Sequence, residues 1–224
     1  MVELLPYADL FSVLQILIVF LVSAILFFTL KAYRITSYSF LIAFFIGFTL
    51  LEISFTFVLL NRLFGQTGIL YHGTLWAHAI IQVGAFAFIA STYYFRNKNL
   101  TVISISVMAV VFVVVLFLAF YIYLSFPSEI AFEWRGIIGS YLYAISLGIS
   151  VYLLYNVFMA FTRTPKKSYS DLLIPAGFST LAVAQVLWVY WGITDIGTVL
   201  ALTNSLLLIS LALLTIAVAI IWRR

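Results

Sequence analysis

Two side chains of this sequence could exchange a proton inside an apolar segment, the carboxyl of Glu52 and the imidazole of His78. Glu52 lies within the apolar stretch 38–61, and no other Asp, Glu, Lys or Arg lies so deep in any apolar stretch of the chain. A charged side chain at the centre of a membrane costs roughly 2.5–3.5 kcal/mol on insertion scales, so this carboxyl needs a partner, a proton or water. A Glu–His pair in a low dielectric would also have strongly coupled protonation.

Other polar side chains share the depth of Glu52. His78 and Gln82 lie on one helical face at i, i+4 spacing, and a short connection makes their segment the neighbour of the segment that holds Glu52. We therefore expect Glu52 to meet Gln82, with His78 one turn nearer the surface. Counting inward along each segment places the strongest polar side chains in the outer half of the membrane. This candidate ligand-binding layer comprises Gln15, Glu52, His78, Gln82, Tyr143, Gln185 and Asn204.

Three interpretations of this layer stay open. Polar side chains commonly join membrane helices through hydrogen bonds worth about 0.6 kcal/mol each, so a protonated Glu52 bonded to Gln82 would be purely structural. The layer could instead bind a ligand or receive a signal. It could also form a path for ions or protons, because ionisable side chains inside a membrane are functional by default.

Several kinds of chemistry lack the residues that they need. The sequence has no cysteine, which excludes disulfides, thiol catalysis and thiolate metal sites. Its two histidines, His72 and His78, lie six residues apart on different helical faces, which disfavours a shared metal ion or a haem held between two helices. Motifs of metalloproteases, α/β-hydrolases and phosphate-binding loops are absent as well. We therefore expect a protein that is not an enzyme and that holds no cofactor and no metal.

The elements that position these residues are apolar and long. Of the 224 residues, 66% are hydrophobic and 8% are charged, whereas soluble domains average about 25% charged residues. Seven stretches each approach the roughly 20 residues with which a helix crosses a membrane. The predicted fold is all-α, a polytopic membrane protein that forms a single seven-helix transmembrane domain over 1–224. The predicted helices are about 10–30, 38–61, 74–95, 101–124, 136–161, 171–192 and 197–222.

The charges predict the orientation of this bundle. Nine of the eleven Lys and Arg residues fall on one side of the predicted spans, and only Arg62 and Arg135 fall on the other. Because cytoplasmic connections carry the excess of basic residues, the N-terminus is expected outside and the C-terminus inside. Tyr and Trp near the predicted boundaries are typical of the membrane interfaces, and Trp188 is expected at the outer one.

A short pattern occurs twice in the chain. The stretch Gly47-Phe48-Thr49-Leu50-Leu51 and the stretch Gly177-Phe178-Ser179-Thr180-Leu181 lie in the second and the sixth predicted helix. With 101–124 as a spacer, the first three and the last three helices have the same orientation. This pattern predicts a parallel 3+1+3 repeat of the kind found in transporters.

The size and topology resemble two families of seven-helix membrane proteins. Microbial rhodopsins hold retinal on a lysine of the seventh helix, but 197–222 contains no lysine. Seven-helix sugar transporters with 3+1+3 repeats carry a Pro-Gln motif. Here 10–30 has Leu14-Gln15 and 136–161 has neither Pro nor Gln. The resemblance is therefore limited to architecture.

Together these features predict a non-catalytic integral membrane protein. One form of this hypothesis is a small sensor that binds a ligand and signals through a partner, and another is an accessory subunit of a larger membrane complex. The alternative is a small-solute or proton-coupled transporter with its site in the outer half of the bilayer. The expected partners are the lipid bilayer and either other membrane protein subunits or further copies of the chain, without nucleic acid. The expected location is multi-pass, in the cell membrane of a prokaryote.

Overall fold

The described residues form an all-helical bundle. The computed structural model describes residues 8–38, 40–63, 69–94, 98–125, 131–163, 169–194 and 197–222. Within them lie seven helices, α1 (Ala8–Thr36), α2 (Phe40–Leu63), α3 (Ile69–Tyr94), α4 (Lys98–Ser125), α5 (Ala131–Arg163), α6 (Tyr169–Thr194) and α7 (Gly197–Trp222). Each predicted span overlaps one of these helices, and the all-α class is confirmed.

The length and apolarity of the helices are those of a multi-pass membrane protein. Five of the described helices contain stretches long and apolar enough to cross a membrane: Leu10–Thr36, Leu41–Asn61, Tyr141–Arg163, Asp171–Trp191 and Thr198–Ile220. Shorter apolar stretches occupy Trp76–Thr92 in α3 and Ile103–Leu118 in α4.

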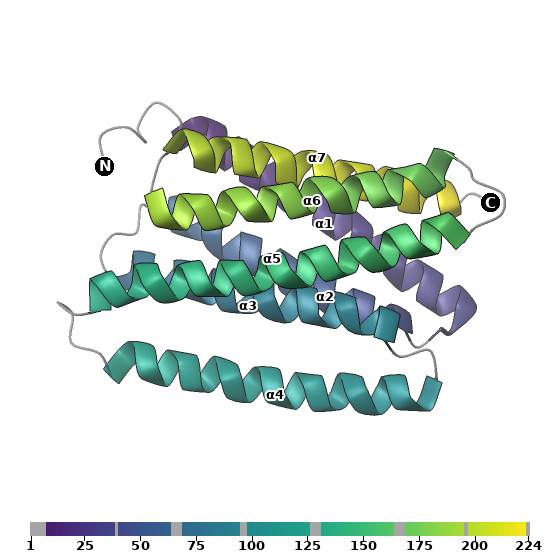
Figure 1. The fold of residues 1–224 in the computed structure, drawn as a ribbon, viewed down its shortest axis with the longest axis horizontal. Helices are drawn as coiled ribbons and strands as arrows, with labels where there is room; N and C mark the ends of the chain where they lie inside the picture. The colour runs from purple at the N-terminus through teal and green to yellow at the C-terminus, as the bar shows by residue number, and fades with distance from the viewer. Residues whose placement is uncertain are drawn as a thin grey trace.

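Consecutive helices run in opposite directions along the bundle (Figure 1). One end, called here the Ala8 end, holds the starts of α1, α3, α5 and α7. The opposite end, the Thr36 end, holds the starts of α2, α4 and α6. A left-handed residue closes α1 there, since Ser37 has a φ of 54° and its N–H donates to the carbonyl of Tyr33 at 2.8 Å. This cap reverses the chain into α2.

Six helices close into a ring. Each packs on two neighbours in the order α1, α2, α3, α5, α6, α7 and back to α1. α4 lies outside this ring against α3, with slight contact to α2 (Figure 1). Its Phe112 ring fills the space that a Cβ on Gly84 of α3 would occupy. Most described α4 side chains are exposed, so this helix does not enclose the core.

Large apolar side chains fill the middle of the ring, and two glycines bring helices close together. A Cβ on Gly47 would lie 2.9 Å from the carbonyl oxygen of Ala85, and a Cβ on Gly177 would lie 2.8 Å from Cγ of Leu214. The missing side chains therefore let α2 lie tightly on α3 and α6 tightly on α7. By contrast, a Cβ on Gly148 would meet nothing within 4 Å.

Candidate functional site

Glu52 and Ser54 lie on different flanks of α2, because two residues turn a helix by about 200°. Glu52 is half-buried, and its Oε1 accepts a hydrogen bond from Oγ of Ser23 on α1 at 2.5 Å. Ser54 is fully buried, and its Oγ lies 2.6 Å from Nδ1 of His78 on α3. The expected contact between Glu52 and Gln82 is therefore not formed. The carboxyl turns to α1, and α3 meets Ser54 instead.

His78 packs among aromatic rings near the Ala8 end. Its ring centroid lies 5.4 Å from that of Trp188, 5.6 Å from Phe55 and 6.4 Å from Tyr143. The rings of Tyr143 and Trp188 stack with centroids 5.1 Å apart, and Phe11 belongs to the same buried cluster. We call Phe11, Phe55, His78, Tyr143 and Trp188 the aromatic layer. It joins α1, α2, α3, α5 and α6.

The expectation that Trp188 marks the outer interface is wrong. Its side chain is only 1% exposed. Besides its contacts in the aromatic layer, its ring meets that of Trp191 edge-on, with centroids 5.3 Å apart. Aromatic side chains near helix ends are typical of interfaces, but this one faces the ring interior, where other aromatic rings cover it.

A layer of polar side chains lies one helical turn further from the Ala8 end. On α3, Gln82 follows His78 by four residues, and on α5, Ser146 follows Tyr143 by three. On α6, which runs the opposite way, Gln185 precedes Trp188 by three residues. All three steps lead in the same direction along the bundle, so the three polar groups lie at matched depth.

Two further amides extend this level across α1 and α7. Gln15 follows Phe11 by four residues, and Asn204 follows the buried Leu200 by four. The Nε2 of Gln15 donates to Oδ1 of Asn204 at 2.9 Å, and Nδ2 of Asn204 donates to the carbonyl of Leu200 at 3.0 Å. We call Gln15, Gln82, Ser146, Gln185 and Asn204 the polar layer.

The polar layer is mostly paired on the α1–α7 side, where Oε1 of Gln15 alone has no hydrogen-bond partner among the described residues. Its five side chains are at most 1% exposed. Both amide atoms of Gln82, both of Gln185, and Oγ of Ser146 have no hydrogen-bond partner among the described residues. The same holds for Nε2 of His78 and Nε1 of Trp188 in the aromatic layer. Since an unpaired buried polar group costs about 1–3 kcal/mol, the α3–α5–α6 side has a strong capacity for hydrogen bonding.

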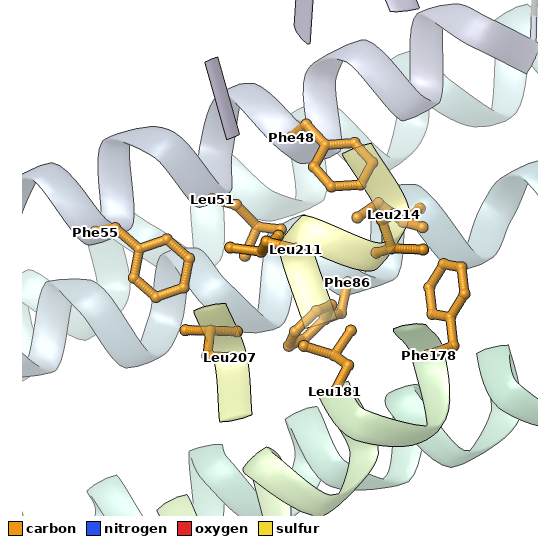
Figure 2. A pocket seen from close by; sticks show the side chains of 10 residues that line it. Phe48, Leu51, Phe55, Phe86, Phe178, Leu181, Leu207, Leu211 and Leu214 are labelled. Atoms are coloured by element: carbon orange, nitrogen blue, oxygen red, sulfur yellow. The ribbon is translucent and has the colours of Figure 1, made fainter. Parts of the chain in front are cut away.

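Apolar side chains close the polar layer on the side of the Thr36 end. Figure 2 shows Phe and Leu side chains of α2, α3, α6 and α7 that converge on a small cavity. Among them are Phe86, one turn beyond Gln82, and Leu181, one turn beyond Gln185. The interior volume of the cavity is about 10 Å³, which is at most the room for one water molecule. It is part of the packed core rather than a ligand site.

The structure brings most of the predicted site residues together. Six of the seven lie in the polar layer or in the aromatic layer above it: Gln15, His78, Gln82, Tyr143, Gln185 and Asn204. Glu52 lies apart from them, on the α1 flank of α2. Ser146 and Trp188 complete the two layers and were not among the predicted site residues. Their i, i+3 spacing from Tyr143 and Gln185 is the signal that could have found them.

No group of three His, Asp or Glu side chains that could hold a metal ion gathers within the part of the chain that is described. The chain matches no protein-family model, no curated protein and no solved structure. The role of the two layers therefore has to be inferred from their own chemistry.

Proposed function

We propose that this chain is a non-catalytic integral membrane protein whose bundle binds a small, uncharged polar ligand in the polar layer. The observation that carries this proposal is the set of fully buried, unpartnered polar atoms on Gln82, Ser146 and Gln185. Side chains that only join helices would pair with one another, as Gln15 and Asn204 do at the same depth. A ligand with matching donors and acceptors would remove the cost of the unpaired groups.

The chemistry of the layer indicates the class of ligand. Each carboxamide offers an acceptor oxygen and an NH₂ donor, and a hydroxyl offers both functions. No charged side chain belongs to the two layers, so a charged ligand would lose its hydration without meeting an opposite charge. The stacked rings of Tyr143 and Trp188 provide an apolar cover above the amides. Small amides, ureas and polyols fit this description.

The placement of charges supports the predicted orientation. Lys31 and Arg34 lie in the last turns of α1, and Arg163 ends α5, so all three lie at the Thr36 end. With that end inside, the polar layer is nearer the outside. In the sensor form of the proposal, the ligand draws α3, α5 and α6 together, and the altered packing reaches a partner protein through the outer helix faces.

Thermal unfolding in mild detergent tests the binding site. The probes are acetamide, methylurea and glycerol. At least one probe should raise the Tm of the wild type. The same probe should leave the Tm of Gln82→Leu and of Gln185→Leu unchanged. Thr180→Val is the matched control, because the Thr180 hydroxyl donates to the carbonyl of Ala176 on its own helix. A wild type that responds to none of the probes, or variants that respond as it does, would contradict the proposal.

A second function, transport of the same class of solute, is favoured by the order of the ring. Exchanging α1, α2 and α3 with α5, α6 and α7 leaves every helix contact of the ring in place. The two close-packed glycines, Gly47 and Gly177, are 130 residues apart. So are two pairs of residues that line the apolar cavity, Phe48 with Phe178 and Leu51 with Leu181.

The partners of these glycines match in the same way. Gly47 faces Ala85 and Ile89 on α3, and Gly177 faces Ser210 and Leu214 on α7; both pairs differ by 125 residues. This correspondence supports the parallel 3+1+3 repeat with α4 as the spacer, an arrangement typical of transporters.

Flux measurements separate the two functions. If the chain is a transporter, proteoliposomes loaded with the probe that binds should release it faster than protein-free liposomes with the same load. Leu181→Ala, which enlarges the apolar cavity between the polar layer and the Thr36 end, should change that rate. A probe that binds to the protein but never crosses the membrane would favour the sensor function over transport.

A further inference from the structure

The contact between Glu52 and Ser23 lies outside the polar layer, and the proposed ligand site does not include it. Glu52 is 12 residues from Phe40 and 11 residues from Leu63, which is roughly 17 Å from either end of α2. Ser23 lies equally near the middle of α1. The carboxyl is therefore at mid-depth, half-buried in the groove between α1 and α2.

The described part of the chain neutralises this carboxyl incompletely. Ser23 has one hydroxyl proton and two acceptors within reach, Oε1 of Glu52 at 2.5 Å and the carbonyl of Val19 at 3.0 Å. Among the described residues, Glu52 has no second hydrogen-bond partner and no basic neighbour. One shared donor is little support for a carboxylate at the middle of a membrane, where such groups pair with an opposite charge or face water.

Neither lipid headgroups nor a second copy of the chain supplies that charge at this depth. The hydrocarbon core of a bilayer is about 30 Å thick, so headgroups lie roughly 15 Å from a group at mid-depth. In the sequence, every Lys and Arg falls near a helix end or between helices. The closest on α1 is Lys31, eight residues from Ser23, or roughly 12 Å along the axis. A basic side chain at the level of Glu52 would therefore come from another protein.

The surface beside the carboxyl suits a helix. Ile16, Phe20 and Phe27 share one stripe of α1 with Ser23, and they are 51%, 69% and 61% exposed. On α2, Ile53 beside Glu52 is also exposed. The groove thus offers one acidic group framed by large apolar side chains.

We propose that the α1–α2 groove docks one transmembrane helix of a different protein, which sets a single Lys or Arg side chain against Glu52. Opposite charges attract strongly where water is scarce, and the apolar stripe supplies van der Waals contact along the helix. In the accessory-subunit or signalling role, the partner would thus be a membrane protein with a basic residue in a transmembrane helix. The docking surface is independent of the ligand in the polar layer.

Synthetic transmembrane peptides test the docking surface. The probe is a Leu/Ala helix with one central Arg, which stays protonated, in vesicles of phosphatidylcholine. Because the chain has no cysteine, one introduced cysteine at the C-terminus carries the dye for energy transfer. The central-Arg peptide should bind at least about tenfold more tightly than a central-Leu peptide. Moving the Arg two turns along the peptide should remove this advantage.

Variants attribute the effect to the carboxyl. Glu52→Gln keeps an acceptor for Ser23 and should lower the affinity for the Arg peptide to that of the Leu peptide. Val151→Gln is the control, at an exposed position of α5, which packs between α3 and α6, and should keep the preference. Ser23→Ala removes the competing internal donor and should strengthen Arg-peptide binding.

Equal affinities for the Arg and Leu peptides, or an unchanged preference in a Glu52→Gln protein that keeps its Tm, would overturn the docking proposal. Gln82→Leu should leave peptide binding unchanged while it abolishes the response to small polar probes. The ligand site and the docking surface can therefore fail separately.

Discussion

The two places where α1–α3 meet α5–α7 are equivalent in the ring but differ in chemistry. At the α1–α7 junction, Gln15 and Asn204 form a hydrogen bond of 2.9 Å. At the α3–α5 junction, Gln82 and Ser146 lie at the same depth and are as deeply buried, yet they have no partner among the described residues. At the first junction the two side chains bond to each other, although Oε1 of Gln15 has no partner among the described residues. The other junction has buried hydrogen-bonding groups without a partner among the described residues.

This difference separates stability from the proposed binding role within a single layer. Polar groups that bond to each other hold two helices together, and removing one leaves its buried partner without a hydrogen bond. Polar groups that bond to nothing in the bundle weaken it, and their replacement by apolar side chains relieves that cost. The same Gln→Leu change should therefore have opposite effects on stability at the two junctions.

The largest effect is expected from the ring that covers the unpaired junction. Trp188→Ala removes the stack on Tyr143 and the contact with His78, and should lower the free energy of unfolding by about 3 kcal/mol. Thermal or denaturant unfolding in detergent measures this loss. Tyr190→Ala, at an exposed position on the same helix, should change it by less than about 0.5 kcal/mol. Similar losses of unfolding free energy in both variants would show that the aromatic layer contributes no more to stability than an exposed aromatic side chain.

A smaller loss is expected from the glycines that make the two halves alike. A Cβ at position 47 would lie 2.6 Å from Cγ1 of Ile89, and one at position 177 would lie 2.8 Å from Cγ of Leu214. Gly47→Ala and Gly177→Ala should each cost about 1–3 kcal/mol in unfolding experiments. Gly148→Ala has open space and should cost nothing. A cost at only one of the two close-packed glycines would break the equivalence of the halves.

The paired junction should respond more weakly. Asn204→Leu removes a buried hydrogen bond and leaves Nε2 of Gln15 without its acceptor. This change should lower the free energy of unfolding by about 1 kcal/mol. Adding Gln15→Leu should recover part of that loss, and the double-mutant cycle gives the coupling directly. Additive losses would mean that the bond contributes nothing and that the two junctions are alike.

The smallest effect, and one of opposite sign, is expected at the unpaired junction. Gln82→Leu or Gln185→Leu removes no hydrogen bond seen among the described residues. Each change should leave the free energy of unfolding unchanged or raise it by no more than about 1 kcal/mol. The measurement is the same unfolding curve without any ligand. A clear loss of stability in both variants would mean that these amides have structural partners, and the contrast between the junctions would disappear.

Much of the fold could be predicted because long apolar stretches have few alternatives in a membrane. Four of the predicted spans differ from their helices by at most three residues at either end, whereas α1 ends six residues later than expected and α3 and α5 each begin five residues earlier. The order of helices around the ring could not be predicted in this way. Hydropathy gives the length of each helix, whereas the neighbours depend on side-chain packing.

That order explains which site predictions held. The depth of Gln82, Gln185 and Asn204 follows from counting along helices, so their shared level could be predicted. The partner of Glu52 could not, because a carboxyl on the flank of α2 meets α1 or α3 according to how α2 is rotated. The burial of Trp188 is likewise decided by the rings that cover it, and helix position alone does not reveal them.

The peripheral position of α4 has a consequence for how the chain could be divided. This helix is the covalent link between the groups α1–α3 and α5–α7, yet the contacts that close the ring do not pass through it. The two groups are in effect partners in a dimer joined by a tether. Cutting that tether should leave two polypeptides that assemble as separate chains, through an interface that contains both the Gln15–Asn204 bond and the unpaired amides.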